Sequence, residues 1–105
     1  MDQETIQNKI AESIHLKDPN AEAYLFGSRA RGDHKPDSDW DILILVDDPK
    51  FTNELDDKFR EDLYKLSLES EQVISILVYP KKYWKDKLTY SPLYENVAEE
   101  GIKLT

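Results

Sequence analysis

The run from Trp40 to Val46 constrains the fold of this chain more than any other feature of its sequence. Apart from Asp41 the run is apolar, and a short apolar run of this kind is typical of a central strand that is covered on both faces. Such a strand needs neighbouring strands beside it and helices above and below it. The run therefore predicts an α/β fold, in which helices pack on a small sheet.

Apolar periodicity and capping residues predict the elements on either side of this strand. Two further strands are expected at 21–26 and 72–79, and helices at 2–17, 28–32, 49–70, 81–88 and 92–100. The long helix is predicted to begin with Asp48 as its N-cap and Pro49 in its first turn, because both residues favour those positions. Its apolar stripe is expected to comprise Phe51, Leu55, Phe59, Leu63 and Leu66. Trp84 is expected in the core.

The composition limits the kinds of partner that the chain can bind. Its length of 105 residues, with 39% hydrophobic and 34% charged residues, predicts one globular domain over 1–105. The net charge of −8 argues against general nucleic-acid binding, which needs a basic surface. No apolar run approaches the roughly 20 residues of a membrane helix, the N-terminus lacks the apolar stretch of a secretory signal, and there is no cysteine. These features predict a cytoplasmic protein that does not bind membranes.

A Gly-Ser turn precedes the central strand. The strand expected at 21–26 leads into Gly27 and Ser28, and a short helix is expected directly after it. The N–H groups at the start of a helix have no partner within the helix, so they can bind a phosphate. Ser28 adds a hydroxyl donor, and Arg29 and Arg31 are candidate phosphate ligands. The alternative for each arginine is a solvated side chain.

Two aspartates flank Trp40 at the start of the central strand. Side chains at positions i and i+2 of a strand share a face, so Asp39 and Asp41 are expected to project together. Carboxylate oxygens are the ligands that Mg²⁺ and Mn²⁺ prefer, and Mg²⁺ commonly binds substrate phosphates at the same time. The pair therefore predicts a metal–nucleotide site. The alternative is two solvated carboxylates at the end of a strand.

Taken together, these residues resemble the signature of the minimal nucleotidyltransferases, small members of the DNA polymerase β-like nucleotidyltransferase superfamily. The resemblance rests on Gly27-Ser28, on Arg29-Ala30-Arg31-Gly32, and on Ser38 followed by Asp39-Trp40-Asp41. It implies a mixed sheet and the metal-dependent transfer of a nucleoside monophosphate from a nucleoside triphosphate. In the implied site Asp39 and Asp41 are the catalytic metal ligands, and the nucleotide-binding residues are Gly27, Ser28, Arg29, Arg31 and Ser38.

The resemblance also implies a cofactor, a substrate and a partner. The cofactor is Mg²⁺ or Mn²⁺, and the substrate is ATP or another nucleoside triphosphate. Several minimal nucleotidyltransferases resemble the antitoxin of a two-gene module whose toxin is an all-helical HEPN protein, and such antitoxins adenylylate a tyrosine of the toxin. A HEPN-type partner is therefore expected to supply the acceptor hydroxyl. Association with copies of itself is a second expectation for a chain of this size.

One acidic residue of the family pattern is missing from this chain. A third carboxylate usually comes from the strand expected at 72–79, but here that strand contains neither Asp nor Glu, and Ser75 stands at the expected position. Glu69 and Glu71 precede the strand and are the nearest substitutes. Two hypotheses follow. The chain is an active nucleotidyltransferase, or it is a catalytically weak or inactive domain that binds a nucleotide or a partner as an antitoxin.

Overall fold

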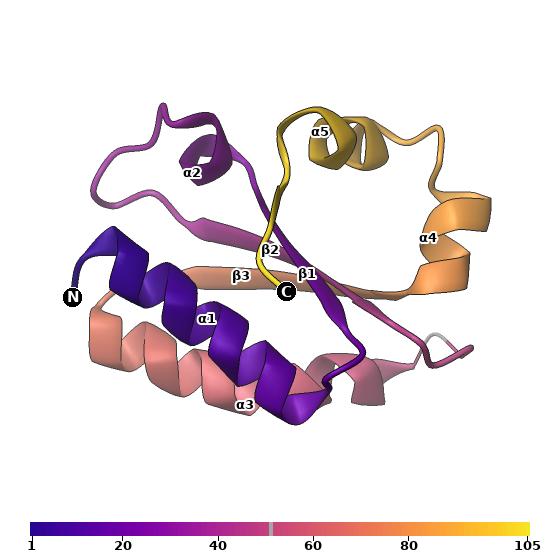
Figure 1. Ribbon diagram of the computed structural model, residues 1–105, viewed down its shortest axis with the longest axis horizontal. Helices are drawn as coiled ribbons and strands as arrows, with labels where there is room; N and C mark the ends of the chain where they lie inside the picture. The colour runs from indigo at the N-terminus through magenta and orange to yellow at the C-terminus, as the bar shows by residue number, and fades with distance from the viewer. Residues whose placement is uncertain (51) are drawn as a thin grey trace.

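A mixed sheet lies between two layers of helices in the computed structural model of the chain, which describes residues 1–50 and 52–105 (Figure 1). The strands are β1 (Glu22–Phe26), β2 (Trp40–Val46), β3 (Ile74–Pro80) and β4 (Ile102–Lys103). The helices are α1 (Gln3–Lys17), α2 (Ser28–Arg31), α3 (Asn53–Ser70), α4 (Lys81–Lys87) and α5 (Pro92–Glu100). The predicted α/β class and mixed sheet are confirmed.

The strand expected at the centre of the sheet, β2, does lie there, since the strand order is β3-β2-β1-β4. β2 pairs in parallel with β3 and antiparallel with β1, which in turn pairs antiparallel with β4. The parallel pair needs a crossover connection, and α3 provides it. The register sets Asp41 opposite Phe26 of β1 and opposite Ser75 of β3. Asp41 therefore lies at the end of the sheet where β1 finishes and where β2 and β3 begin.

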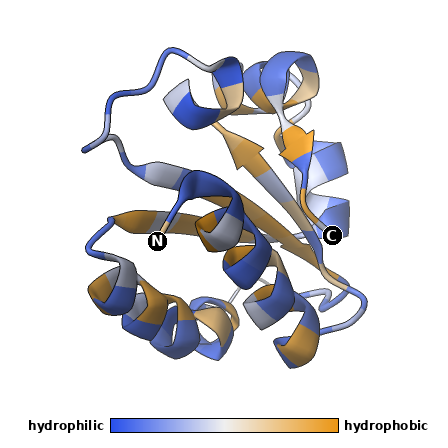
Figure 2. Cartoon of the chain, turned by 60° about the vertical axis from the view of Figure 1, so that its left-hand side comes forward, coloured by the Kyte–Doolittle hydropathy of each residue, from blue (hydrophilic) through white to orange (hydrophobic). Residues whose placement is uncertain are grey.

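Alternation along β2 separates two apolar clusters. The even-numbered residues of β2 pack with the buried stripes of α1 and α3, whereas Leu43 and Leu45 pack with Trp84 of α4 and with half-buried residues of α5. The strands are accordingly mostly apolar, and the outer sides of the helices are hydrophilic (Figure 2). Asp41 has the same parity as Leu43 and Leu45, so its side chain belongs to the face that α4 and α5 cover.

The boundaries of two elements differ from the prediction. α3 begins at Asn53 with Thr52 as its N-cap, so the predicted start at Asp48 and Pro49 is wrong. Asp47, the residue before Asp48, forms an ion pair with Lys81, with 2.8 Å between its carboxylate and Nζ. Phe51, which is predicted to belong to the apolar stripe of this helix, lies outside the residues that the structure describes.

The sequence does not predict β4, because a strand of two residues has no periodicity and is defined only by its pairing with β1. The predicted start of the last helix is confirmed, since the Ser91 hydroxyl accepts a hydrogen bond from the N–H group of Tyr94. Trp84 is buried as expected. Within residues 1–50 and 52–105, no helix has both the length and the apolar character that crossing a bilayer requires.

Candidate functional site

The turn between β1 and α2 has a backbone conformation that favours glycine. Gly27 has φ 78° and ψ −159°, a combination that is essentially restricted to this residue type. A Cβ atom at this position would lie 2.3 Å from Oδ2 of Asp41, so the carboxylate occupies the space that a side chain would need. The turn therefore allows a carboxylate of the neighbouring strand to lie directly against the backbone.

The helix that follows this turn exposes backbone donors at its start. α2 comprises 4 residues, and the N–H groups of Ala30 and Arg31 both donate to the carbonyl of Gly27 at 3.1 Å. The N–H groups of Ser28 and Arg29 come before these and lie outside the hydrogen bonds that the helix makes with itself. Such a short helix has only a weak dipole. Anion binding here would therefore depend on those two N–H groups and on the Ser28 hydroxyl.

Asp39 and Asp41 form a carboxylate pair at the start of β2. Asp39 is exposed, Asp41 is half-buried, and neither makes an ion pair with a residue that the structure describes. Burial raises the pKa of Asp41, the charge of Asp39 raises it further, and the charge of Arg31 acts in the opposite direction. The pair fits a divalent cation, because a cation would offset the mutual repulsion of the two carboxylates.

The pair alone would leave much of a metal's coordination shell open. The described residues contain no group of three or more His, Cys, Asp or Glu side chains that could hold a metal ion. Mg²⁺ typically binds one or two carboxylates and completes its octahedral shell with water and substrate phosphates. The donor set therefore suits a metal ion that arrives with a nucleotide rather than a permanent structural ion.

Ser75 occupies the position at which the third carboxylate is expected. It pairs with Asp41 in the parallel register of β2 and β3, so its exposed side chain shares the face of that carboxylate. Glu69 lies in the last turn of α3 and Glu71 directly after it, and α3 packs on the opposite face of the sheet. Neither of these two acids replaces the missing carboxylate in this arrangement.

Arg29 supports the loop that carries Asp39. Its side chain is buried, and its guanidinium carbon lies 4.6 Å from the centroid of the Trp40 ring, on the face opposite to the carboxylate pair. Its nitrogens donate at 2.9 to 3.2 Å to the carbonyls of Ser38 and Pro36 and to the side chain of Gln72. The Ser38 hydroxyl stabilises the same loop by accepting a hydrogen bond from the N–H group of Lys35. The side chains of Arg29 and Ser38, which are predicted to bind the nucleotide, therefore make their hydrogen bonds within the protein.

Arg31 lies on the exposed side of α2 at the entrance to the site. Its Nε lies 3.2 Å from Oδ2 of Asp33, and its Nη1 lies 3.2 and 3.4 Å from the two carboxylate oxygens of Glu100 at the end of α5. The helices α2 and α5 are neighbours in Figure 1. The hydrogen bond to Asp33 and the charge of Glu100 raise the pKa of Arg31, so it stays positively charged. No local signal in the sequence indicates Glu100, which is 69 residues away along the chain.

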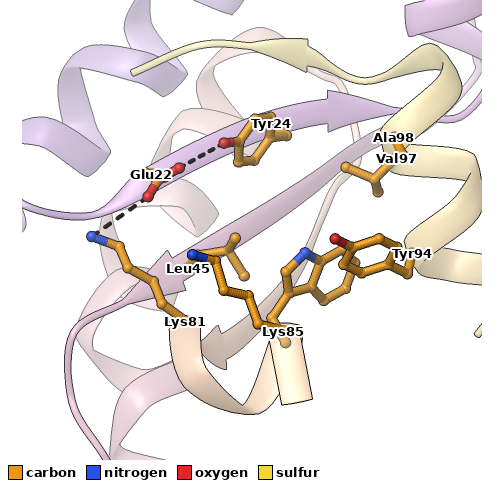
Figure 3. Close-up of a pocket in the computed structure, with 9 residues that line it drawn as sticks. Glu22, Tyr24, Leu45, Lys81, Lys85, Tyr94, Val97 and Ala98 are labelled. Carbon is orange, nitrogen blue, oxygen red and sulfur yellow. Dashed lines mark hydrogen bonds and ion pairs between the residues drawn. The ribbon is translucent and has the colours of Figure 1, made fainter. Parts of the chain in front are cut away.

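A separate pocket of about 280 Å³ lies farther along the same face of the sheet (Figure 3). Leu45 lies at its base, Trp84 and Tyr94 come from the helices around it, and Lys81 and Lys85 extend along one side. Leu45 follows Asp41 by four residues along β2, a separation of roughly 13 Å in an extended strand. None of the predicted site residues lines this pocket. The pocket is therefore separate from the carboxylate pair.

A hydrogen bond at the edge of this pocket makes stability depend on pH. The Tyr24 hydroxyl donates to Oε1 of Glu22 at 2.6 Å. Burial and this hydrogen bond raise the pKa of Tyr24 from its usual 10.0 to about 12. Because the folded-state pKa is the higher one, the neutral phenol stabilises the fold below pH 10. This contribution is lost as the pH rises through about 12.

We expect Tyr24→Phe to lower the free energy of unfolding at pH 7 by about 1 kcal/mol, because one hydrogen bond to a charged, partly exposed group is lost. The variant should also lose less stability than the wild type between pH 10 and pH 12. Urea unfolding at pH 7 and pH 11 measures both effects. Tyr64→Phe is the control, since the Tyr64 side chain is 62% exposed. Equal behaviour of the two variants would contradict this account.

The family of the chain follows from comparison with known proteins. Residues 7–104 match the family of nucleotidyltransferase domains. Two proteins of Methanocaldococcus jannaschii, both provisionally named protein adenylyltransferases, are 40% and 39% identical to the chain. These matches cover 73% and 66% of this chain, and 70% and 69% of the two archaeal proteins.

Solved structures share the fold. A toxin–antitoxin structure with AMP-PNP contains a chain that matches with a TM-score of 0.67 at 25% identity, over 94% of this chain and 72% of that one. A complex of a tri-AMPylated Shewanella oneidensis HEPN toxin with an MNT antitoxin gives a TM-score of 0.64 at 23% identity, over 99% and 72%. The resemblance that Gly27-Ser28 and Asp39-Trp40-Asp41 indicate is thereby confirmed, and the chain belongs to the polymerase β-like nucleotidyltransferase domain family.

Proposed function

We propose that the chain transfers AMP from ATP to a hydroxyl group of a partner protein, with a divalent metal ion bound by Asp39 and Asp41. The observation that carries this proposal is the contact between the carboxylate of Asp41 and the backbone of Gly27. At this point the N–H groups that suit phosphate oxygens meet the carboxylate oxygens that suit Mg²⁺. A nucleotide–metal complex needs both kinds of group side by side.

Each group at the site has a distinct role in the proposed reaction. Mg²⁺ or Mn²⁺, when bound, supplies positive charge that offsets the charge of the phosphates. Asp39 and Asp41 hold this ion, while the N–H groups of Ser28 and Arg29 and the Ser28 hydroxyl bind phosphate oxygens. The acceptor oxygen forms a bond to the α-phosphorus, the bond from that phosphorus to the bridging oxygen breaks, and pyrophosphate leaves. The hydroxyl proton passes to a carboxylate of the site or to a base of the partner.

The relatives support a protein as the acceptor. The two archaeal proteins are provisionally named protein adenylyltransferases, and an MNT antitoxin occurs in complex with a HEPN toxin that carries AMP. We therefore infer that the acceptor is a tyrosine of a HEPN-type partner. The partner would also supply the surface that holds this tyrosine against the site.

A second function is favoured by one specific observation, the serine beside Asp41. Serine carries no charge and is a poor ligand for Mg²⁺. With two carboxylates the site would still hold a metal that arrives with a nucleotide, but it would activate the acceptor hydroxyl less well. In this alternative the chain acts as an antitoxin mainly by binding a nucleotide and its partner.

Both functions require the chain to bind a nucleotide, so a measurement of nucleotide binding tests the site that they share. A ligand that binds only the folded state stabilises it by about 2.7 kcal/mol at 100 times its dissociation constant. ATP with Mg²⁺ is therefore expected to raise the melting temperature of the wild type, and Asp39→Asn with Asp41→Asn to abolish the increase. ATP with EDTA is the control for the metal. Equal shifts in the wild type and the double variant would overturn the proposed site.

Asp41→Asn alone provides a control for folding. The pKa of Asp41 is raised by burial and by Asp39, so its ionised form is disfavoured in the folded protein. At neutral pH this charge costs stability, and the cost disappears as the pH falls through the raised pKa. In the absence of nucleotide, Asp41→Asn should therefore melt at a higher temperature than the wild type at pH 7. Loss of the nucleotide effect in a more stable variant cannot result from unfolding.

A further inference from the structure

The guanidinium of Arg31 is held by carboxylates from two distant parts of the chain. Asp33 follows Arg31 by two residues, just beyond α2, whereas Glu100 is the last residue of α5. These two residues bind Nε and Nη1, and the described residues provide no acceptor for Nη2. An arginine presents its N–H donors in a rigid planar fork, so fixing two of the nitrogens also fixes the direction of the third.

Glu100 reaches the site because the chain turns there from α5 into β4. The N–H group of Gly101 donates to the carbonyl of Val97 at 2.9 Å, and β4 then pairs with β1 so that Ile102 lies opposite Leu25. This brings the end of α5 beside the end of β1, which leads into Gly27. The side chain of Glu100 is 20% exposed, against 47% for that of Arg31. The carboxylate is thus the more enclosed partner and can act as the fixed support.

We propose that Glu100 is a positioning residue, which holds Arg31 with Nη2 directed toward the phosphates of the bound nucleotide. The inference rests on the proposed function, because it requires a nucleotide beside Gly27 and Asp41. The N–H group of Arg31 donates to the carbonyl of Gly27 at 3.1 Å, so Arg31 lies one helical turn from the backbone against which the Asp41 carboxylate packs. Glu100 itself acts only through Arg31 and touches neither the nucleotide nor the metal.

Removing the carboxylate of Glu100 is expected to change the affinity for the nucleotide, and the direction of this change separates positioning from simple electrostatics. Glu100 adds a negative charge near a site for an anionic nucleotide, so charge alone predicts that removing this carboxylate strengthens binding. Positioning predicts the reverse, because a released arginine must be ordered again each time the nucleotide binds. A purely structural role of Glu100 in holding α5 predicts lower stability with unchanged affinity.

The test compares Glu100→Gln with Glu99→Gln. Both variants remove one negative charge from the same turn of α5, but the exposed Glu99 makes no ion pair with a described residue. Calorimetric titration with ATP and Mg²⁺ in 0.1 M salt is expected to show affinity about two- to tenfold weaker for Glu100→Gln, the cost of ordering one long side chain. Glu99→Gln should bind as tightly as the wild type or slightly more tightly. In an Arg31→Gln background, Glu100→Gln should have no further effect.

A second measurement does not depend on the nucleotide. The ¹⁵N relaxation of the Arg31 Nε–H group in the free protein should show greater motion in Glu100→Gln and no change in Glu99→Gln. If the wild type binds ATP with Mg²⁺ and Glu100→Gln binds equally well or better, the positioning role is wrong. If the wild type does not bind the nucleotide at all, the proposed function itself fails.

Discussion

Gly27→Ala is expected to abolish metal-dependent nucleotide binding, although it adds a single methyl group. The backbone at this position is essentially accessible only to glycine, and a non-glycine residue there costs about 1–3 kcal/mol. The added Cβ would also lie 2.3 Å from Oδ2 and 3.2 Å from Cγ of Asp41. The carboxylate must therefore rotate away from the turn, and it then no longer shares a cation with Asp39. Urea unfolding measures the first effect, and calorimetric titration with ATP and Mg²⁺ measures the second.

Gly32→Ala is the matched control for this substitution. Gly32 also has a positive φ, 87° with ψ 4°, but no atom lies within 4 Å of the position that its Cβ would take. Alanine in this left-handed conformation costs about 1–2 kcal/mol. We expect Gly32→Ala to lose that stability and to keep its affinity for the nucleotide. Both titrations are made at a temperature far below the melting temperatures of the variants. If the two variants then bind the nucleotide with equal affinity, the contact between Gly27 and Asp41 is not part of the binding site.

The parts of the fold that follow from local pattern are predictable from the sequence. The apolar run of β2 predicts a central strand, which the strand order confirms, and the register confirms that Ser75 stands beside Asp41 on one face. The start of α3 is not predictable in this way. An Asp-Pro pair is a common helix start, but here the chain passes Asp48 and Pro49 before α3 begins, with Thr52 as its N-cap. A local capping signal alone therefore does not determine where this helix starts.

The two arginines after Ser28 show a second limit of what can be predicted from the sequence. In a helix with 3.6 residues per turn, side chains two positions apart point roughly 200° away from each other. Arg29 and Arg31 must therefore lie on opposite sides of α2, but the motif does not reveal which one is buried. That choice depends on Gln72 and Glu100, which lie 43 and 69 residues away in sequence from their respective arginines. The structure leaves Arg31 as the more exposed of the two, so it is the arginine that we expect to bind a phosphate.

Ser75→Asp is expected to raise the rate of AMP transfer by about 10²–10⁴, the usual contribution of a positioned general base. The new carboxylate would lie beside Asp41 on the same face, where it is able to accept the acceptor proton and to bind the metal. The affinity for ATP should change little, since in the proposed site Asp39 and Asp41 are sufficient to hold the ion that accompanies the phosphates. Transfer of labelled AMP to a co-expressed HEPN-type partner measures the rate, and titration measures the affinity.

Ser75→Asn is the control, because asparagine has nearly the shape of aspartate without its charge. It should leave the transfer rate of the wild type unchanged. Without metal, a third carboxylate increases the repulsion at the site, so Ser75→Asp should be less stable than Ser75→Asn, and Mg²⁺ with ATP should remove much of that difference. If the wild type already transfers AMP rapidly and neither Glu69→Gln nor Glu71→Gln slows it, the base comes from the partner or from the aspartate pair. Ser75→Asp would then add little, because the step that it assists would no longer limit the reaction.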